Sequence, residues 1–537
     1  MYTELLFRDE ARTKLLAGAG TVADAVRGTL GPESRSVLLE RKWGDPIVCD
    51  DGVTIAKQIK LKDQVENLGA QLLRNAAIDT GDAVGDGTTT ATLLADAIFR
   101  EGVRNVVMGT SAVGIKRGLQ RGLDAAVGAI HGLSRPVKDR TDTEHVATVS
   151  AHDDPEVGRL VADAVARVGP EGVVEVEEAK GTETLLEVVE GMQLDKGYLS
   201  PYFVTDAEAM EAVLDHPLIL LVDRKVAVVT ELLPVLEEVA KAGRSILVIA
   251  ETVEGEALAA LVVNKLRGML GAVAVKAPAF GERRRAILED IGILTGTRPV
   301  SDELGQKLES ITIDALGSAE RVVVTKDTAT IIGGAGAPGA VNGRCDELRR
   351  QIKDSTSDYD REKLEERLAK LSGGVALIRV GAVSEAALKR QKDAFDDAIS
   401  ATRAAVAEGI VPGGGTAFLR AIEAVEEEAS RCEGAERVGV QIVRNALEIT
   451  TRQIARNAGI DEGPVVEKVR AGLGFFGLDA RTKDYTDLDE RGIIDPTKVV
   501  RVALENAVAV AGVLLLAEAT MIEIEEHEPP ASSPEML

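Results

Sequence analysis

The segment from Gly81 to Thr90 contains the side chains best suited to chemistry. Gly85 and Gly87 flank Asp86, so the backbone can turn tightly and bring its N–H groups against an anion. Three threonine hydroxyls follow at the expected start of a helix, and a carboxylate such as Asp86 suits Mg²⁺ beside phosphates. The chain has no Gly-x-x-x-x-Gly-Lys-Ser/Thr motif, which excludes a Walker-type loop. A turn followed by an ordinary helix cap is the alternative interpretation.

Helices must position this segment, because apolar residues recur at three- and four-residue spacing on both sides of it. In the middle of the chain, the apolar runs 219–222, 245–249 and 272–275 are each followed by a helical segment. This alternation predicts a parallel βα domain inserted into a helical one. The expected helices are residues 10–30, 66–79, 89–107, 111–132, 384–408, 415–429, 434–458 and 497–517.

Glycines mark both ends of the insert, Gly191 at its start and Gly373-Gly374 at its end. We interpret them as hinges, and turns at strand edges are the alternative. Residues 334–339 match Gly-x-Gly-x-x-Gly, but they come late in the domain and include a proline, so a surface loop is predicted instead of a dinucleotide fingerprint. Residues 341–371 form a predicted helical hairpin.

Length and charge limit the architecture and the partners. A chain of 537 residues exceeds what one hydrophobic core organises, so about two to four domains are expected. The net charge of −25 argues against nucleic acid or an anionic membrane as the main partner. Five histidines without a His-Glu-x-x-His motif give no indication of a metal cluster.

The N-terminus, the apolar stretches and the cysteines predict a soluble protein of the cytoplasm. Acidic residues near the N-terminus do not fit a secretion signal, and the longest apolar stretch, 507–517, is too short to span a bilayer. Cys49, Cys345 and Cys432 are far apart, without a Cys-x-x-Cys spacing, which favours reduced thiols.

Seven motifs occur in an order and at a spacing that resemble a group I chaperonin of the GroEL type, over residues 5–525. They are Thr29-Leu30-Gly31-Pro32, Asp51-Gly52-Val53-Thr54, Gly85-Asp86-Gly87-Thr88-Thr89-Thr90, Gly197-Tyr198-Leu199-Ser200-Pro201-Tyr202-Phe203, Thr356-Ser357-Asp358-Tyr359-Asp360-Arg361-Glu362-Lys363-Leu364, Gly413-Gly414-Gly415 and Asp495-Pro496-Thr497-Lys498.

The resemblance implies a multidomain α and α/β fold. Its parts would be a helical equatorial domain (1–133 and 409–525), a small α+β intermediate domain (134–190 and 375–408), an inserted α/β apical domain (191–374) and a disordered tail (526–537). It also implies a homo-oligomer of two stacked seven-membered rings that works with a GroES-type co-chaperonin on unfolded client proteins. Residues 452–464 carry one residue more than the usual inter-ring pattern, so stacking stays open.

The resemblance also implies an ATPase site, with ATP and Mg²⁺ as cofactors and K⁺ as a further ion. Asp86 would hold the magnesium ion, while Asp51 and Asp397 would orient and activate the attacking water; spacing alone does not bring these residues together. The residues implied to contact nucleotide are Thr29, Leu30, Gly31, Pro32, Asp86, Gly87, Thr88, Thr89, Thr90, Gly414, Asp479, Ala480, Ile493 and Asp495.

Client binding would be the task of the insert. Leu233, Leu236 and Val239 share one helix face, and Leu258 with Val262 and Val263 share another. Such stripes are ordinarily buried core, but the resemblance implies that they face a central cavity, where an apolar ring suits unrelated clients. The implied client and co-chaperonin contacts are Tyr198, Tyr202, Phe203, Leu233, Leu236, Leu258, Val262 and Val263.

Three features depart from the family pattern. Asp50 stands where bacterial chaperonins carry a lysine near phosphate, Glu33-Ser34-Arg35-Ser36 replaces Lys-Gly-Arg-Asn, and the tail lacks Gly-Gly-Met repeats. We therefore predict an ATP-driven chaperonin with weakened nucleotide affinity. An ATP-insensitive holding or scaffold paralogue is the alternative. A metabolic phosphotransferase is a more distant one, because the sequence shows no second substrate site and no arginine clamp.

Overall fold

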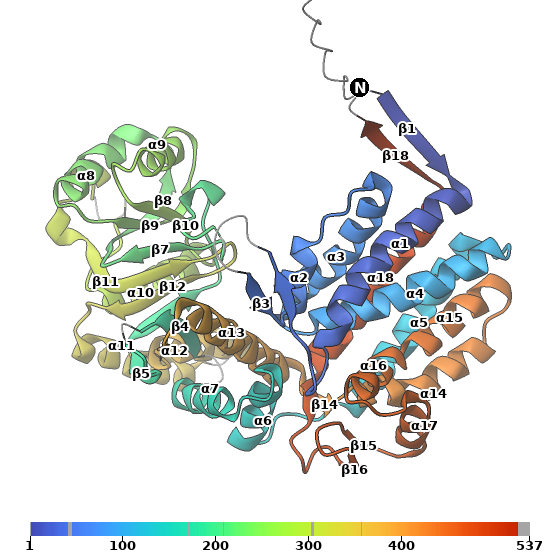
Figure 1. Cartoon of the computed structure of the whole chain (residues 1–537). Coiled ribbons are helices and arrows are strands. Elements are labelled where there is room, and N and C mark those ends of the chain that lie inside the picture. Colours follow the sequence, from blue (N-terminus) through green and yellow to red (C-terminus); the bar gives the residue numbers. More distant parts are fainter. Residues whose placement is uncertain are drawn as a thin grey trace, which may run out of the picture. The chain divides into compact units, whose positions relative to one another are not determined.

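The computed structural model describes residues 2–40, 46–169, 172–179, 181–207, 209–301, 306–355 and 357–524 (Figure 1). The chain divides into unit 1, residues 1–162 with 384–537, and unit 2, residues 163–383. Helix α7 (Pro155–Val168) crosses the boundary. The predicted disordered tail and Thr356 lie outside the described residues.

The described residues of unit 1 are mainly helical, with four pairs of short strands, which confirms the helical ends predicted for the chain. Its strand pairs are β1 with β18, β2 with β3, β14 with β17 and β15 with β16, all antiparallel. Its elements before the insert are β1 (Tyr2–Phe7), α1 (Arg8–Val26), η1 (Arg27–Thr29), β2 (Val37–Leu39), β3 (Ile47–Cys49), α2 (Gly52–Gln58), α3 (Gln64–Val84), α4 (Thr88–Val107), α5 (Ala112–Leu133) and α6 (Arg140–Ser150). Those after it are α13 (Glu385–Glu408), β14 (Ile410–Pro412), α14 (Thr416–Ser430), α15 (Gly434–Ala446), α16 (Ile449–Asn457), α17 (Glu462–Ala471), β15 (Phe476–Asp479), β16 (Asp484–Asp487), β17 (Ile494–Pro496), α18 (Thr497–Leu516) and β18 (Ala519–Ile524).

Helix α18 lies in the core of unit 1, where it contacts α3, α4, α5 and α13 (Figure 1). By length and composition it is the one helix among the described residues that could cross a membrane. The helix predicted over 497–517 is confirmed, since α18 has 20 residues, and the apolar run 507–517 covers its C-terminal half. Ala507, Ala511 and Leu514 are fully buried against the neighbouring helices, which accounts for its apolar character within the fold.

One expected helix is interrupted. Residues 434–458 form two helices, α15 and α16, because the chain tightens at Leu447 and Glu448. The Glu448 N–H bonds to the carbonyl of Asn445, three residues back, at 3.4 Å. The Glu448 carboxylate is paired with Arg444 and Arg452 on either side of the break, at 2.7 and 2.6 Å, so the side chains stabilise the turn.

Unit 2 contains a seven-stranded sheet in the order β10-β9-β8-β11-β12-β6, with β7 paired to β11. Strands β8, β9 and β10 are parallel and each is followed by a helix, which confirms the predicted alternation of strands and helices. A second sheet has the order β4-β13-β5. The elements of unit 2 are β4 (Val173–Glu178), β5 (Leu185–Val189), β6 (Gly191–Leu194), η2 (Pro201–Phe203), β7 (Ala212–Asp215), β8 (Leu218–Val226), α8 (Val229–Lys241), β9 (Ile246–Val253), α9 (Gly255–Leu266), β10 (Ala272–Lys276), α10 (Gly281–Thr295), η4 (Leu308–Ser310), η5 (Ile313–Ala315), β11 (Gly317–Val324), β12 (Ala329–Gly334), α11 (Pro338–Asp354), α12 (Asp358–Ser372) and β13 (Val375–Val380).

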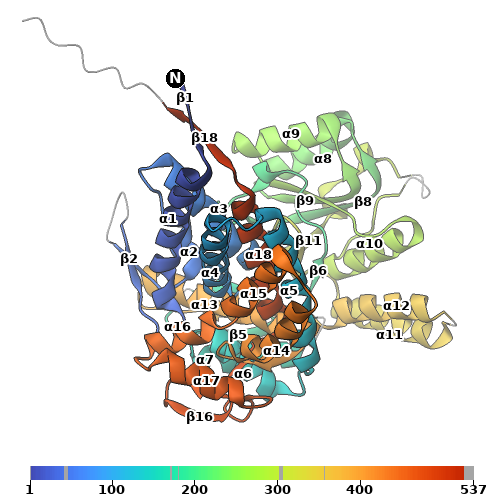
Figure 2. The ribbon, with the colours of Figure 1, turned by 90° about the vertical axis from the view of Figure 1, so that its right-hand side faces the viewer.

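Within unit 2, both views show α8 and α9 on one side of β8 and β9, and α10 with the α11–α12 hairpin on the other (Figures 1 and 2). The hairpin was predicted, and Leu364, Leu368 and Leu371 pack on the core of the unit. Two glycines of 334–339 serve close packing, because a Cβ on Gly334 would lie 2.3 Å from the carbonyl oxygen of Leu294 and one on Gly336 would lie 2.0 Å from that of Ile293 in α10. The three cysteines are free and buried, as expected for reduced thiols.

Candidate functional site

The loop between α3 and α4 is a tight turn made by two glycines. Gly85 ends α3 with φ +71° and Gly87 begins α4 with φ +77°, both in the left-handed region. The loop is packed from two sides, since a Cβ on Gly85 would lie 2.3 Å from Ser400 of α13 and one on Gly87 would lie 2.8 Å from Val499 of α18. This packing fixes the position of Asp86 between them.

The Asp86 carboxylate is held by two donors. The Gly87 N–H bonds to one oxygen, and the Ser150 hydroxyl, at the end of α6, donates to the other at 2.8 Å. Thr88 and Thr89 then form the buried first turn of α4, a 20-residue helix. The first N–H groups of a helix have no acceptor within it, and the helix dipole favours negative charge there, so this end of α4 suits a phosphate.

A second helix begins beside this turn. Asp51 caps α2, and its carboxylate accepts hydrogen bonds from the N–H groups of Val53 at 3.2 Å and Thr54 at 2.9 Å. A side chain on Gly52 would overlap the Thr89 hydroxyl, at 2.3 Å, so the two helix starts are in close contact. The sequence motifs around Asp51 and Asp86 are therefore brought together by the fold of unit 1.

Asp397, on α13, joins the same group of carboxylates. Burial raises its pKa to about 9, and the negative charges of Asp86 and Asp51 add to the shift. Among the described residues, no Lys, Arg or His side chain pairs with Asp397. Without a ligand, the carboxyl therefore keeps its proton at neutral pH, and it needs added positive charge nearby before it can accept a proton from water.

Asp495 is a fourth carboxylate near Asp86. Burial raises its pKa to about 7, with the charge of Asp86 as the second cause. It lies in β17, which pairs with β14, and a Cβ on Gly413 would come 3.2 Å from its Oδ1. The next residue, Gly414, has φ +65° and open space where a side chain would be, so a ligand can approach its backbone.

The remaining expected nucleotide contacts outside α4 fall in three segments. Residues Thr29 to Pro32 are anchored by Asn457 of α16, whose amide donates to the Leu30 carbonyl at 2.8 Å, and Thr29 shares a 3.2 Å hydroxyl contact with Thr89. Asp479 and Ala480 are buried in the turn after β15, while Ile493 is half-buried and its carbonyl accepts the Gly413 N–H at 3.0 Å.

Two residues at this site were not found from the sequence. Ser150 gave no signal, because a lone serine at a helix end is ordinary. Asp393 lies one helical turn before Asp397, a spacing that shares a helix face and was available in the sequence. Desolvation raises the pKa of the Asp393 carboxyl, and Asp51 and Asp50 add to the shift against the opposing charge of Lys389.

The donor set suits magnesium bound with a nucleotide. The described residues contain no group of three His, Cys, Asp or Glu side chains arranged to hold a metal alone. Mg²⁺ usually takes one or two protein carboxylates and completes its shell with water and phosphate oxygens. Asp86, with Asp51 and Asp397 within electrostatic reach and no cation paired with Asp397, fits that requirement.

The expected client residues differ in exposure. Tyr202, Leu233 and Val263 are exposed, by 64%, 46% and 42%, and Leu266 and Met269 extend the same apolar region. Tyr198, Leu258 and Val262 are partly buried against the core of unit 2. Phe203 and Leu236 are buried at 0% and 6% exposure, so this structure offers no surface at either of them. Their buried positions reflect the inward faces of η2 and α8.

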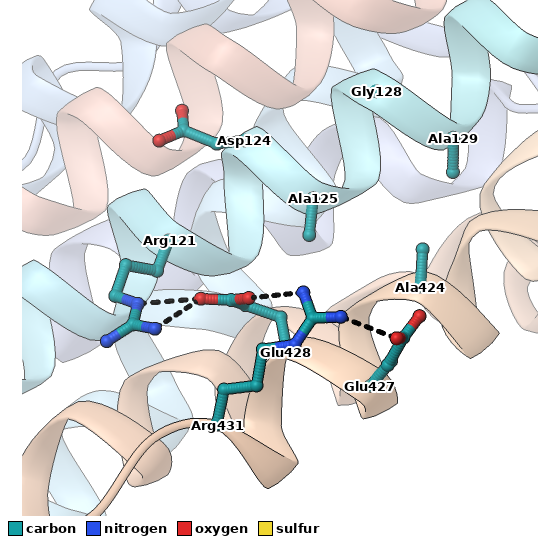
Figure 3. A pocket seen from close by; sticks show the side chains of 9 residues that line it. All are labelled: Arg121, Asp124, Ala125, Gly128, Ala129, Ala424, Glu427, Glu428 and Arg431. Carbon is teal, nitrogen blue, oxygen red and sulfur yellow. Dashed lines mark hydrogen bonds and ion pairs between the residues drawn. The ribbon is translucent and has the colours of Figure 1, made fainter.

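Surface hollows occur in each unit. One, of about 430 Å³, is lined by α5 and α14 in unit 1, where Arg121 and Arg431 are paired with Glu428 and Glu427 over a floor of alanines and glycine (Figure 3). Another, of about 280 Å³, lies in unit 2 beside Phe280. The ion pairs of the first hollow satisfy one another, so it contains no group prepared for chemistry.

Two comparisons with known proteins match nearly the whole chain. The model of the TCP-1/cpn60 chaperonin family matches residues 22–525. Chaperonin GroEL 5 of Bradyrhizobium diazoefficiens is 59% identical over 525 residues, which are 98% of this chain and 97% of that protein. Both matches include the segments that bring Asp51, Asp86, Asp397 and Asp495 together.

Proposed function

The chain belongs to the TCP-1/cpn60 chaperonin family, and from this premise we propose that it is an ATP-dependent chaperonin that binds non-native proteins and promotes their folding in an enclosed cavity. The ATPase part of the proposal rests on the carboxylates gathered at the starts of α2 and α4. Burial and the negative charge of neighbouring carboxylates raise the pKa of Asp397 there, and no described cation pairs with it. A divalent cation bound together with a polyphosphate would supply the positive charge that this group lacks.

Each residue has a distinct role in the proposed hydrolysis. Thr88, Thr89 and the N–H groups of α4 would bind phosphate, while Asp86 would hold the metal. Magnesium bound there would neutralise phosphate charge and lower the pKa of the neighbouring carboxyls. Asp397 would accept a proton from the attacking water, and Asp51 would orient that water, as positioning and charge stabilisation suffice for phosphoryl transfer.

The exposed side chains of unit 2 support client binding. Tyr202, Leu233, Val263 and Leu266 come from η2, α8 and α9, and α9 contacts both of the other elements. Exposed apolar surface binds other apolar surface without reading its sequence, so many unfolded chains can share it. We propose that clients and a GroES-type co-chaperonin compete for this region.

Exposed strand pairs of unit 1 support assembly into a ring. Leu5 and Phe7 of β1 and Met521 of β18 are exposed, and so are Leu38 and Val48 in the β2–β3 pair. Each pair is a two-stranded sheet with free edges, which is marginal alone and is stabilised when further strands are added. We propose homo-oligomeric rings of seven subunits, two of them stacked, in the cytoplasm.

The proposed cycle needs movement between domains. Gly191 lies in β6, and Gly374, with φ +67°, lies between α12 and β13, positions that suit hinges together with Gly373. With these hinges, the proposal retains three domains: equatorial (1–133 and 409–525), intermediate (134–190 and 375–408) and apical (191–374). Nucleotide binding would be coupled to apical movement and to release of the client.

Steady-state ATP hydrolysis with Asp397→Ala tests this proposal. We expect slow hydrolysis by the wild-type protein and a loss of about a hundredfold or more in the variant, because a positioned general base contributes at least that much. Asp124→Ala is the matched control, since Asp124 is an exposed aspartate in the middle of α5. No wild-type hydrolysis above the Asp397→Ala level would instead favour an ATP-insensitive holding protein, with Asp50 and Glu33 as the cause.

A further inference from the structure

The short turn after α6 joins the two sides of the nucleotide site. Ser150, the last residue of α6, donates to the metal-side carboxylate of Asp86 at 2.8 Å. Three residues later, Asp153 Oδ2 lies 2.8 Å from Arg481 Nη2. Arg481 follows Ala480, an expected nucleoside contact. The segment from Ser150 to Asp153 therefore reaches from the metal side of the site to its nucleoside side.

The backbone of this turn is strained. His152 and Asp153 have φ values of +56° and +64°, in the left-handed region that side chains other than those of Asn and Asp rarely adopt. Two such residues in succession persist only where their surroundings hold them. The Asp153 N–H is held by the Thr148 carbonyl at 2.9 Å, and the Asp153 side chain by Arg481.

Arg481 is itself positioned by the loop that carries it. Asp479 Oδ1 accepts the N–H groups of Arg481 at 3.0 Å and Thr482 at 3.2 Å, which fixes the turn after β15. The Asp153 side chain is only 29% exposed. Burial raises the pKa of Asp153, and the charge and hydrogen bond of Arg481 oppose that shift.

The other end of α6 is tied to the same segment of chain. Asp142, in the first turn of α6, accepts two hydrogen bonds from Arg135 at 2.7 and 2.9 Å, and Arg135 also pairs with Asp489. Asp489 and Arg481 both lie between β15 and β17. This segment, which also carries Ile493, therefore holds α6 at both ends, and the Asp153–Arg481 pair is the end beside the nucleotide residues.

We propose that the Asp153–Arg481 ion pair is a latch that keeps the end of α6 closed over bound nucleotide and slows its release. The inference rests on the proposed function, since it concerns the same site. When the pair opens, the turn relaxes from its left-handed conformation and Ser150 leaves Asp86. Arg481 is a positioning residue in this role, because it acts through Asp153 and the turn.

The test measures the dissociation rate of methylanthraniloyl-ADP, with magnesium, from the assembled full-length protein. We expect Arg481→Gln and Asp153→Asn each to speed release about threefold to fivefold, as for a partly exposed ion pair, and the double variant to add nothing further. Asparagine tolerates positive φ, so Asp153→Asn removes charge without adding strain. Arg481→Lys should restore most of the wild-type rate.

Arg431→Gln is the control, because Arg431 makes exposed ion pairs on α14, away from this turn (Figure 3). Wild-type release should also become faster with added salt, whereas Arg481→Gln should respond less. Rates equal to wild type in both single variants, or two effects that add in full, would overturn the latch. A wild-type protein that binds no analogue would be recognised before dissociation is measured, and would overturn the proposed function and the latch together.

Discussion

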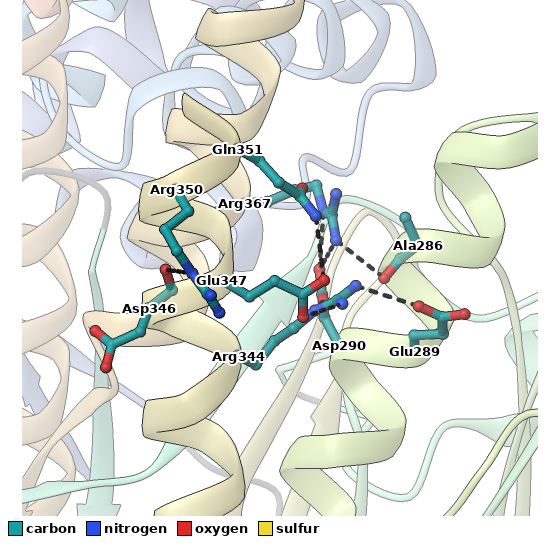
Figure 4. A network of polar contacts seen from close by, with 9 residues as sticks. All are labelled: Ala286, Glu289, Asp290, Arg344, Asp346, Glu347, Arg350, Gln351 and Arg367. Carbon is teal, nitrogen blue, oxygen red and sulfur yellow. Dashed lines mark hydrogen bonds and ion pairs between the residues drawn. The ribbon is translucent and has the colours of Figure 1, made fainter. Parts of the chain in front are cut away.

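One fully buried carboxylate of unit 2 and two half-buried carboxylates of unit 1 have opposite electrostatic surroundings. In unit 2, Asp290 of α10 is 1% exposed and receives Arg344 Nε at 2.7 Å and Arg367 Nε at 2.8 Å, from α11 and α12 (Figure 4). In unit 1, Asp397 has a pKa raised to about 9 and Asp495 one raised to about 7, and no described cation pairs with either.

The difference separates a structural use of charge from a functional one. A buried charge is costly unless a partner of opposite sign and hydrogen bonds compensate for it. Around Asp290 the fold supplies both, so three helices are held together by one carboxylate. Around Asp397 the fold supplies only more negative charge. Such an arrangement is expected where a ligand brings the missing cation. Until the ligand binds, the unpaired carboxylates lower the stability of the protein.

Breaking the paired region should have the largest effect on stability. Asp290→Asn would leave Arg344 and Arg367 buried with an uncharged partner, and we expect it to lower the free energy of unfolding of unit 2 by about 3 kcal/mol. Hydrogen exchange at the β8 and β9 amides in the full chain measures this. Asp346→Asn removes an exposed pair with Arg349 and should cost less than about 0.5 kcal/mol. Equal effects of the two variants would show that the network around Asp290 does not clamp the helices.

Replacing the titratable carboxyl of Asp397 with an amide should do the reverse and raise stability. In the unfolded chain this carboxyl titrates near 3.8, and in the folded chain near 9, so its favourable contribution is complete below pH 3.8 and is lost as pH rises through 9. Asp397→Asn does not titrate. Without nucleotide, it should therefore be more stable than wild type, by a difference that grows by about 1.4 kcal/mol per pH unit between pH 6 and 8.

Hydrogen exchange of the α13 amides at pH 6, 7 and 8 measures this difference. Asp124→Asn, at an exposed position of α5 in the same unit, is the control. A wild type that is as stable as Asp397→Asn at all three pH values would mean that unit 1 compensates the charge of Asp397 after all. The two regions would then no longer differ in kind.

Short sequence patterns predicted those parts of the structure that depend only on neighbouring residues. The glycines around Asp86 and the start of α4 followed from turn and cap residues, and the βα order of unit 2 from short apolar runs. Periodicity did not show that Glu448 interrupts a helix, because that break depends on Arg444 and Arg452 pairing with it.

Contacts between distant segments could not be predicted from spacing. Asp397 is more than 300 residues from Asp86, and only the resemblance to a family placed them in one site before the fold did. A helical stripe also does not show how deeply each member lies, so Leu233 and Leu236 received one interpretation although the first is exposed and the second buried. Arg481 pairs with Asp153, which lies 328 positions earlier, and no sequence motif predicts this contact.

The smallest expected effect comes from placing a positive side chain beside the carboxylates of unit 1. Asp50 lies next to Asp51, and its charge contributes to the raised pKa of Asp393, so it belongs to the same negative region. Asp50→Lys should tighten ATP binding by about fivefold, equivalent to about 1 kcal/mol; the unscreened value for a charge reversal near phosphate is about 4 kcal/mol, and solvent reduces it. Isothermal titration with a slowly hydrolysed ATP analogue measures the affinity.

Asp124→Lys makes the same change of charge away from the site and controls for the overall field. If Asp50→Lys binds no more tightly than Asp124→Lys, then Asp50 is already screened, and the negative region around Asp397 is narrower than the comparison with Asp290 implies.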